Sequence, residues 1–123
     1  MRVLVIDDEK NLADTVVWIL EENGFEAIAA YTGAAALDKI SSFPPDIVLS
    51  DVIMPGMNGI DVCSIVQTKF PHCHVLLLSG QEVTNELLYN ARRRGFEWEL
   101  LAKPIDPEEL LAKLTTLTKS DME

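Results

Sequence analysis

The sequence predicts an α/β protein in which helices cover both faces of a parallel sheet. Short runs rich in Val, Ile and Leu alternate with segments whose apolar residues recur at helical spacing, and this pair occurs five times along the 123 residues. The connections have ordinary lengths for strand-to-helix crossovers, which are right-handed in parallel sheets. We therefore expect a three-layer, doubly wound (βα)5 architecture, formed by residues 1–123 as one domain with a polar tail from about residue 119.

The predicted strands are short and aliphatic. The run 47–49 contains no polar side chain, which is typical of a strand buried on both faces. The run 25–30 alternates more and is less apolar, which favours an edge position in the sheet. The expected strands are Arg2–Ile6, Phe25–Ala30, Asp46–Ser50, His74–Leu78 and Trp98–Ala102.

Apolar stripes and capping signals define the helices between these strands. Asn58 can cap the third helix, and Asp106 can cap the last one, with Pro107 at its first position and Glu109 completing a capping-box-like pattern. The fourth helix is expected from about Val83 to Arg94. The inward stripes are Leu12, Val16, Ile19 and Leu20; Ala36, Leu37 and Ile40; Val62, Cys63, Val66 and Phe70; Leu87, Leu88 and Ala91; and Leu110, Leu111, Leu114 and Leu117.

These elements fit a flavodoxin-like fold with a five-stranded parallel sheet in the order 2-1-3-4-5. The weak apolar character of the second strand suits the edge that this order gives it. The first and third strands then flank the switch point, where open α/β sheets bind ligands beyond the carboxyl ends of the strands.

The composition excludes several classes of function. The chain has 20 acidic against 10 basic residues, a formal net charge of −10, and DNA binding depends mainly on Lys and Arg, so we expect no direct nucleic acid contact. The arginines at 92–94 fit the end of a helix, whose dipole favours cations.

No apolar run approaches the ~20 residues that span a bilayer, and the first residues lack a signal-peptide core. We expect a cytoplasmic protein without a membrane segment, in which Cys63 and Cys73 are reduced.

Polar side chains follow four of the five predicted strands, where each strand ends. Asp7 and Asp8 follow the first strand, Asp51 the third, Ser79 the fourth and Lys103 the fifth. Because the carboxyl ends of parallel strands share one rim, we expect these groups to converge there. A single carboxylate at a strand end is commonly a turn former or a helix cap, whereas this combination of acids, a hydroxyl and an amine is not explained by turn chemistry.

The electrostatics of this rim predict a bound cation. Two like charges ~4 Å apart repel by about 4 kcal/mol at an effective dielectric of about 20. Lys103 supplies one positive charge, and a hard divalent ion with oxygen ligands, Mg²⁺ above all, would supply the rest. The same groups suit phosphoryl transfer, with Asp51 as nucleophile, Asp7 and Asp8 holding the metal, and Ser79 and Lys103 binding the phosphoryl oxygens.

These residues resemble the receiver domain of bacterial two-component response regulators, and the resemblance extends over the whole chain. It implies Mg²⁺-dependent transfer of phosphate from a phosphohistidine to Asp51, a metal contact from the backbone carbonyl of Ile53, and a cis bond between Lys103 and Pro104. The motifs that carry it are Val5-Ile6-Asp7-Asp8-Glu9, Leu49-Ser50-Asp51-Val52-Ile53-Met54-Pro55 with Asn58-Gly59, Leu78-Ser79-Gly80, and Ala102-Lys103-Pro104.

The resemblance also implies the partners and the kind of activity. The donor would be a sensor histidine kinase or a phosphotransfer protein, and the receiver of the signal an output domain, an effector protein or a second copy of the chain. The protein would be a signalling domain rather than an enzyme, since it would catalyse only the phosphorylation and dephosphorylation of its own Asp51. The switching surface would be the face of the fourth helix, fifth strand and fifth helix.

The chain departs from the family pattern near this switching surface. Three residues before the lysine the family usually places Tyr or Phe, whereas here the position is Leu100. We therefore expect signalling from Ser79 to remodel that face without an aromatic rotamer change.

Residues two positions after Asp51 and Ser79 tune dephosphorylation in the family. Here they are Ile53 and Gln81, and we expect slow self-dephosphorylation because apolar Ile53 cannot orient an attacking water.

Three other functions are compatible with parts of the pattern. A phosphatase of the haloacid-dehalogenase type shares the nucleophile, metal, hydroxyl and lysine, but needs a second Asp where Ile53 stands. A flavin-binding module shares the fold, but the acidic loop after the first strand would repel a flavin phosphate. A receiver-like scaffold that binds partners without phosphorylation would be expected to lack Asp51 or Lys103.

Overall fold

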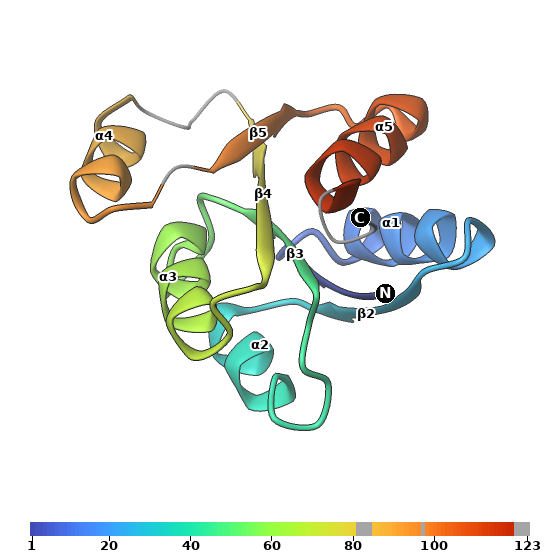
Figure 1. Ribbon diagram of the computed structural model, residues 1–123, viewed down its shortest axis with the longest axis horizontal. Helices are drawn as coiled ribbons and strands as arrows, with labels where there is room; N and C mark the ends of the chain where they lie inside the picture. Colours follow the sequence, from blue (N-terminus) through green and yellow to red (C-terminus); the bar gives the residue numbers. More distant parts are fainter. Residues whose placement is uncertain (81–84, 97, 120–123) are drawn as a thin grey trace.

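The computed structural model describes residues 1–80, 85–96 and 98–119, and along them strand and helix alternate as the sequence predicts (Figure 1). The elements are β1 (Arg2–Ile6), α1 (Lys10–Glu22), β2 (Glu26–Ala30), α2 (Gly33–Lys39), β3 (Ile47–Asp51), α3 (Gly59–Lys69), β4 (His74–Ser79), α4 (Asn85–Arg93), β5 (Glu99–Ala102) and α5 (Pro107–Thr118).

The strands form a five-stranded sheet in the order β2-β1-β3-β4-β5, and every neighbouring pair is parallel. This confirms the doubly wound fold and the predicted order. β2 lies at an edge, in agreement with its weaker apolar pattern, and β3 lies in the middle, where all of its residues are buried. The register places Ser50 beside Ile6 and Asp51 beside Leu78, so the strands end together at one rim.

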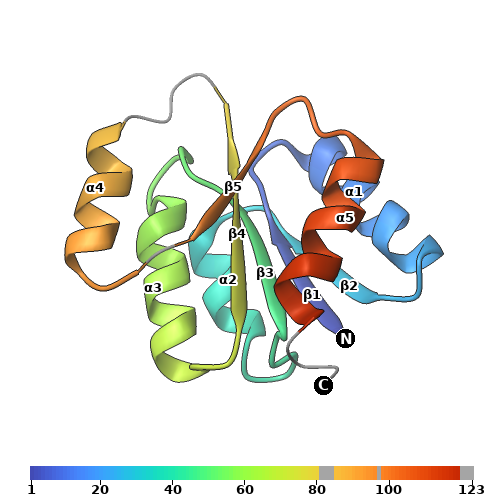
Figure 2. The same ribbon diagram turned by 45° about the horizontal axis from the view of Figure 1, so that its top comes forward.

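Two hydrophobic cores lie on opposite faces of the sheet. Successive residues of a strand point to opposite faces, so β1 contributes Val3 and Val5 to one core and Leu4 and Ile6 to the other. α1 and α5 cover the first face, and α2, α3 and α4 cover the second (Figure 2). The sheet is therefore buried on both sides, and only its rims are open to solvent.

α3 and α5 begin at the caps that the sequence predicts, and α2 has a cap as well. The side chains of Thr32, Asn58 and Asp106 each accept a hydrogen bond from a backbone N–H in the first turn of α2, α3 and α5. In the last case the donor is the amide of Glu108. The expected start of α4 at Val83 lies outside the described residues, as do Gln81 and the end of the polar tail. Among the helices that are described, none is both long and apolar enough to cross a membrane.

The segment before β5 is held against α3 rather than extending the strand. β5 begins at Glu99, one residue later than the sequence predicts. The indole N–H of Trp98 donates to Gln67 Oε1 at 2.9 Å, and Gln67 Nε2 donates to the carbonyl of Cys73 at 2.9 Å. The rings of Phe96 and Trp98 lie 4.9 Å apart. These contacts join the chain before β5 to α3 and to the loop that enters β4.

The two cysteines are free thiols within the core on the α3 side. Both Cys63 and Cys73 are buried, as expected for Cys63 from its place in the helix stripe. Burial raises the pKa of the Cys73 thiol to about 12, and the Asp46 carboxylate adds to the shift. Burial also raises the pKa of Cys63, so both groups stay protonated at neutral pH.

Candidate functional site

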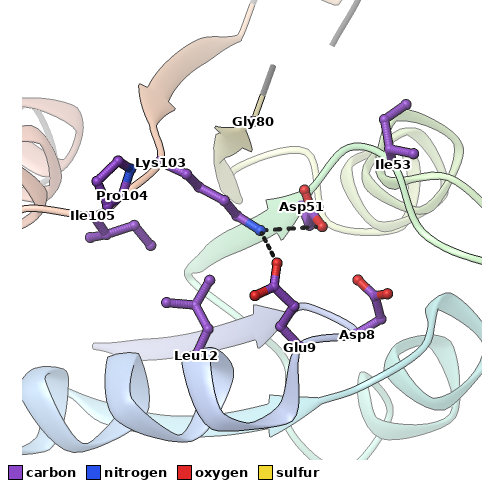
Figure 3. Close-up of a pocket in the computed structure, with 9 residues that line it drawn as sticks. All are labelled: Asp8, Glu9, Leu12, Asp51, Ile53, Gly80, Lys103, Pro104 and Ile105. Carbon is purple, nitrogen blue, oxygen red and sulfur yellow. Dashed lines mark hydrogen bonds and ion pairs between the residues drawn. The ribbon is translucent and has the colours of Figure 1, made fainter. Parts of the chain in front are cut away.

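The carboxyl rim of the sheet contains an open cavity of about 780 Å³. Asp51 reaches it from the end of β3, Lys103 from the end of β5, and Asp8 and Glu9 from the loop between β1 and α1 (Figure 3). Apolar side chains form part of the wall. The lining residues are Asp8, Glu9, Leu12, Asp51, Ile53, Gly80, Lys103, Pro104 and Ile105.

The ammonium group of Lys103 lies at the centre of the charged groups. Its Nζ is 2.9 Å from Asp7 Oδ2, 3.3 Å from Asp51 Oδ2 and 3.4 Å from Glu9 Oε1. The Asp7 side chain is fully buried and the Asp51 side chain is 10% exposed, whereas the Glu9 side chain is 67% exposed. Two of the three ion pairs are therefore largely withdrawn from water, where charges interact more strongly than at the surface.

Asp7 has one satisfied and one unsatisfied carboxylate oxygen. Oδ1 accepts a hydrogen bond from the N–H of Glu9 at 2.9 Å. Oδ2 is close to Lys103 Nζ, but the contact lacks the alignment of a hydrogen bond, so this buried oxygen has no hydrogen-bond donor in the part of the chain that is described. Buried polar atoms are normally hydrogen-bonded, so an oxygen that is held only by an ion pair suits a cation ligand.

The acidic side chains fit a hard divalent ion. Asp7, Asp8 and Asp51 each offer a carboxylate oxygen, and these oxygens lie within 4.8 Å of one another. Carboxylate oxygens are the donors that Mg²⁺ prefers. Together with the unsatisfied oxygen of Asp7, this donor set fits the Mg²⁺ site that the sequence predicts.

The backbone around Asp51 is held on two sides. The Val52 N–H donates to Asp51 Oδ1 at 2.9 Å, and the buried Ser50 hydroxyl donates to the Asp51 carbonyl at 2.9 Å. The Gly59 N–H, at the start of α3, donates to the Val52 carbonyl at 2.8 Å. A Cβ at Gly59 would overlap the carbonyl oxygen of Asp51, so only glycine lets α3 start this close to the end of β3.

Burial and neighbouring charges shift the pKa values of Asp51 and Lys103. Burial raises the pKa of Asp51, and the Asp7 carboxylate raises it further, while Lys103 and the Val52 N–H oppose the shift without cancelling it. For Lys103, burial alone would lower the pKa, but the carboxylates of Asp7 and Asp51 outweigh it and raise the pKa above its ordinary value. The lysine is therefore a cation at neutral pH, whereas the site disfavours the ionised form of Asp51.

The structure brings most of the predicted site residues together. Asp7, Asp8, Asp51 and Lys103 meet at the rim, and the Lys103–Pro104 peptide bond is cis, as the family resemblance implies. Ser79 is half-buried at the end of β4, where its carbonyl accepts from the Lys103 N–H at 2.9 Å. Ile53 lines the cavity and is 42% exposed.

Two residues of the site have roles that the sequence does not reveal. Glu9 and Gly59 both lie within the family motifs, but neither is predicted to act in the site. The contact of Glu9 with Lys103 joins residues 94 positions apart, and no local pattern indicates it. The closeness of Gly59 to Asp51 depends on the path of the intervening loop, although the Asn58-Gly59 pair at a helix start is a signal that could have suggested a close approach.

We expect Asp51→Asn to raise the free energy of unfolding of the metal-free protein at neutral pH. Because the pKa of Asp51 is higher in the folded state than its ordinary value of 3.8, the folded protein binds this proton more tightly, and stability falls as the pH rises above about 3.8. The amide cannot ionise, so its advantage is present at neutral pH and shrinks as the medium becomes acidic. Urea unfolding in EDTA across this pH range measures the difference.

Asp38→Asn provides the matched control for this substitution. Asp38 is exposed on α2, and removing a surface charge of this kind changes stability by less than about 0.5 kcal/mol. An Asp51→Asn protein no more stable than wild type at neutral pH would show that Lys103 fully compensates the Asp51 charge.

The comparisons with known proteins agree with this geometry. A family model for the response regulator receiver domain matches residues 3–115. The DNA-binding response regulator MtrA of Mycolicibacterium paratuberculosis is 31% identical over 113 residues, which are 92% of this chain and 49% of that protein. The chain thus spans about half the length of the curated relatives it matches.

Solved structures share the fold over nearly the full chain. The chemotaxis protein CheY4 of Vibrio cholerae has a TM-score of 0.82 and 29% identity, covering 94% of this chain and 97% of that one. A receiver domain of a Francisella response regulator has a TM-score of 0.79 and 29% identity, covering 98% of each chain. With the family match over residues 3–115, these likenesses show that the chain belongs to the response regulator receiver domains of two-component signalling systems.

Proposed function

We propose that this receiver domain accepts a phosphoryl group on Asp51 from a phosphohistidine and that this modification is its signal. One Asp51 carboxylate oxygen attacks phosphorus, the bond from phosphorus to the donor imidazole nitrogen breaks, and the imidazole leaves with the electron pair. The chain is then a signalling domain that acts on its own Asp51 and not an enzyme with an external substrate.

The surrounding side chains have separate roles in this proposal. Asp7, Asp8, Asp51 and the backbone carbonyl of Ile53 would hold Mg²⁺, which when bound offsets negative charge on the phosphoryl oxygens. Lys103 pairs with one of those oxygens, and the Ser79 hydroxyl donates to another. The Val52 N–H and the Ser50 hydroxyl keep the Asp51 carboxylate and carbonyl oriented while the phosphoryl group arrives.

The observation that carries the proposal is the position of Asp51. It is a largely buried carboxylate at the end of the central strand, 3.3 Å from a lysine, and it shares an oxygen cluster with two further aspartates. Asp51 also lines the open cavity, so a phosphoryl donor can reach a carboxylate that is otherwise largely buried. The haloacid-dehalogenase alternative loses support here, because Ile53 supplies no acid at the position which that chemistry needs.

The partners follow from the family. Response regulators interact with histidine kinases and with output domains, and we propose a sensor kinase or phosphotransfer protein as the donor in the cytoplasm. The curated relatives are named DNA-binding, but they are about twice as long as this chain. With a net charge of −10, this domain would leave any DNA contact to an attached output domain or a separate effector, and a phosphorylation-linked homodimer is a further form of output.

Incubation with acetyl phosphate and Mg²⁺ should add one phosphoryl group, measured by intact-mass spectrometry. The group should be absent from Asp51→Asn and from wild type treated with EDTA, because the acceptor or the metal is then missing. Asp38→Asn, which removes an exposed acid on α2, should be phosphorylated like wild type. A phosphoryl group that persists on Asp51→Asn would refute the proposed acceptor.

The phosphorylated protein should lose its phosphoryl group slowly, over minutes or longer. Ile53 lines the cavity with an apolar side chain and cannot position a water molecule for attack. Ile53→Asn, which offers a polar group at the same place, should shorten the lifetime several-fold. The loss of mass after removal of acetyl phosphate measures both rates, and wild-type decay within seconds would contradict the expectation.

Phosphorylation should remodel the face of α4, β5 and α5 without a rotamer change of the nearby aromatics Phe96 and Trp98. Leu100 packs against the core on the α4 side. The nearby rings of Phe96 and Trp98 are in tilted contact, and Trp98 is hydrogen-bonded to α3. Structures with and without beryllofluoride, a phosphoryl mimic, test this. If the face is the same in both structures, the proposed output surface is wrong.

A further inference from the structure

Glu9 is a charged residue of the rim whose side chain takes no part in capping the helix that it begins. It is the N-cap residue of α1, but its side chain makes no capping hydrogen bond. Ser, Thr, Asp and Asn are preferred at such positions because their short side chains reach the free amides of the first turn. Glu9 makes no hydrogen bond to those amides, and its carboxylate points into the cavity instead (Figure 3).

The backbone of Glu9 is fixed at both ends. Its N–H donates to the buried Asp7 Oδ1 at 2.9 Å, and its carbonyl accepts from the Ala13 N–H at 3.0 Å. The starting point of the side chain is therefore set by the core and by α1. From there the carboxylate reaches Lys103 Nζ at 3.4 Å, so it joins the start of α1 to the end of β5.

We propose that Glu9 is a positioning residue that competes with a phosphoryl group on Asp51 for the ammonium of Lys103. This inference rests on the proposed function. Lys103 has three N–H donors, and in the unphosphorylated protein its ammonium lies within 3.4 Å of carboxylate oxygens of Asp7, Glu9 and Asp51. A phosphoryl group on Asp51 adds oxygens that need the same cation, while the Glu9 charge both holds the lysine and repels those oxygens.

Glu9 differs from the other two partners of Lys103 in its freedom to give way. Asp7 is fully buried and is held by the Glu9 N–H, so its ion pair is a fixed part of the site. Glu9 is 67% exposed and can turn into solvent when the phosphoryl group arrives. It therefore weakens the phosphorylated state without blocking it, and sets how readily the domain switches on.

Three substitutions separate this contact from a general effect of charge. Glu9→Gln removes the charge. Glu9→Asp keeps the charge but shortens the side chain by one methylene and supplies the carboxylate that N-caps prefer, so it turns toward α1 and away from Lys103. Glu22→Gln removes an exposed charge at the other end of α1, about 20 Å away at 1.5 Å per residue.

The measurement is the affinity for beryllofluoride in Mg²⁺ buffer, obtained by calorimetric titration. Glu9→Gln and Glu9→Asp should both bind about two- to five-fold more tightly than wild type, the range expected for one exposed ion pair, and Glu22→Gln should bind like wild type. If Glu9→Asp binds like wild type, or if Glu22→Gln gains as much as Glu9→Gln, the effect is one of net charge and the proposal is overturned. No gain in either Glu9 variant overturns it as well.

Two controls keep the result separable from the proposed function and from folding. Wild type that fails to bind beryllofluoride, or binds it no better than Asp51→Asn, refutes the phosphoacceptor assignment and this inference with it. Wild-type binding that is lost in Asp51→Asn but unchanged by both Glu9 variants refutes the role of Glu9 alone.

Thermal unfolding in EDTA should give Glu9→Asp a Tm at or above wild type, because the helix gains a cap. A lower Tm would show that the shortened carboxylate does not turn toward α1, and the comparison of Glu9→Gln with Glu22→Gln then decides the proposal alone.

Discussion

The geometry of the carboxyl rim depends on the ion pairs that Lys103 makes with the acids around it. Asp7 and Asp51 are largely buried and share this lysine, at 2.9 and 3.3 Å from its ammonium. Two such carboxylates ~4 Å apart would repel each other by about 4 kcal/mol at an effective dielectric of about 20. Burial and then the Asp7 charge raise the pKa of Asp51, and the Lys103 ammonium only partly offsets these two effects. The rim therefore remains short of positive charge, a condition that favours a divalent cation.

The sheet is what makes such a concentration of charge tolerable. β1 and β3 are neighbours at the centre of the sheet, covered on both faces by the hydrophobic cores, so their ends cannot move apart to relieve repulsion. Gly59 brings the start of α3 against the Asp51 carbonyl, and the Ser50 hydroxyl holds the same oxygen. The stability of the cores thus maintains a site that, without a bound cation, is electrostatically unfavourable.

The sequence predicts the parts of this arrangement that follow from topology. Parallel strands end at a common rim, so the convergence of Asp7, Asp8, Asp51 and Lys103 could be expected once the alternating pattern was recognised. Contacts that single side chains make across the fold could not be predicted from that pattern. Trp98 has the aromatic character of a strand residue, yet its hydrogen bond to Gln67 holds it outside β5. Glu9 has no local signal for its contact with Lys103, and the cis bond before Pro104 follows only from family resemblance.

The environments of the two tryptophans give the protein a built-in optical probe. Trp18 is 64% exposed on α1, so its emission is that of a hydrated indole and should respond to quenchers in solution. Trp98 is half-buried, in tilted ring contact with Phe96 and hydrogen-bonded to α3. Any shift of the chain before β5 relative to α3 changes the surroundings of this second indole alone. The difference between the two emission signals therefore reports on one boundary of the fold, without a label.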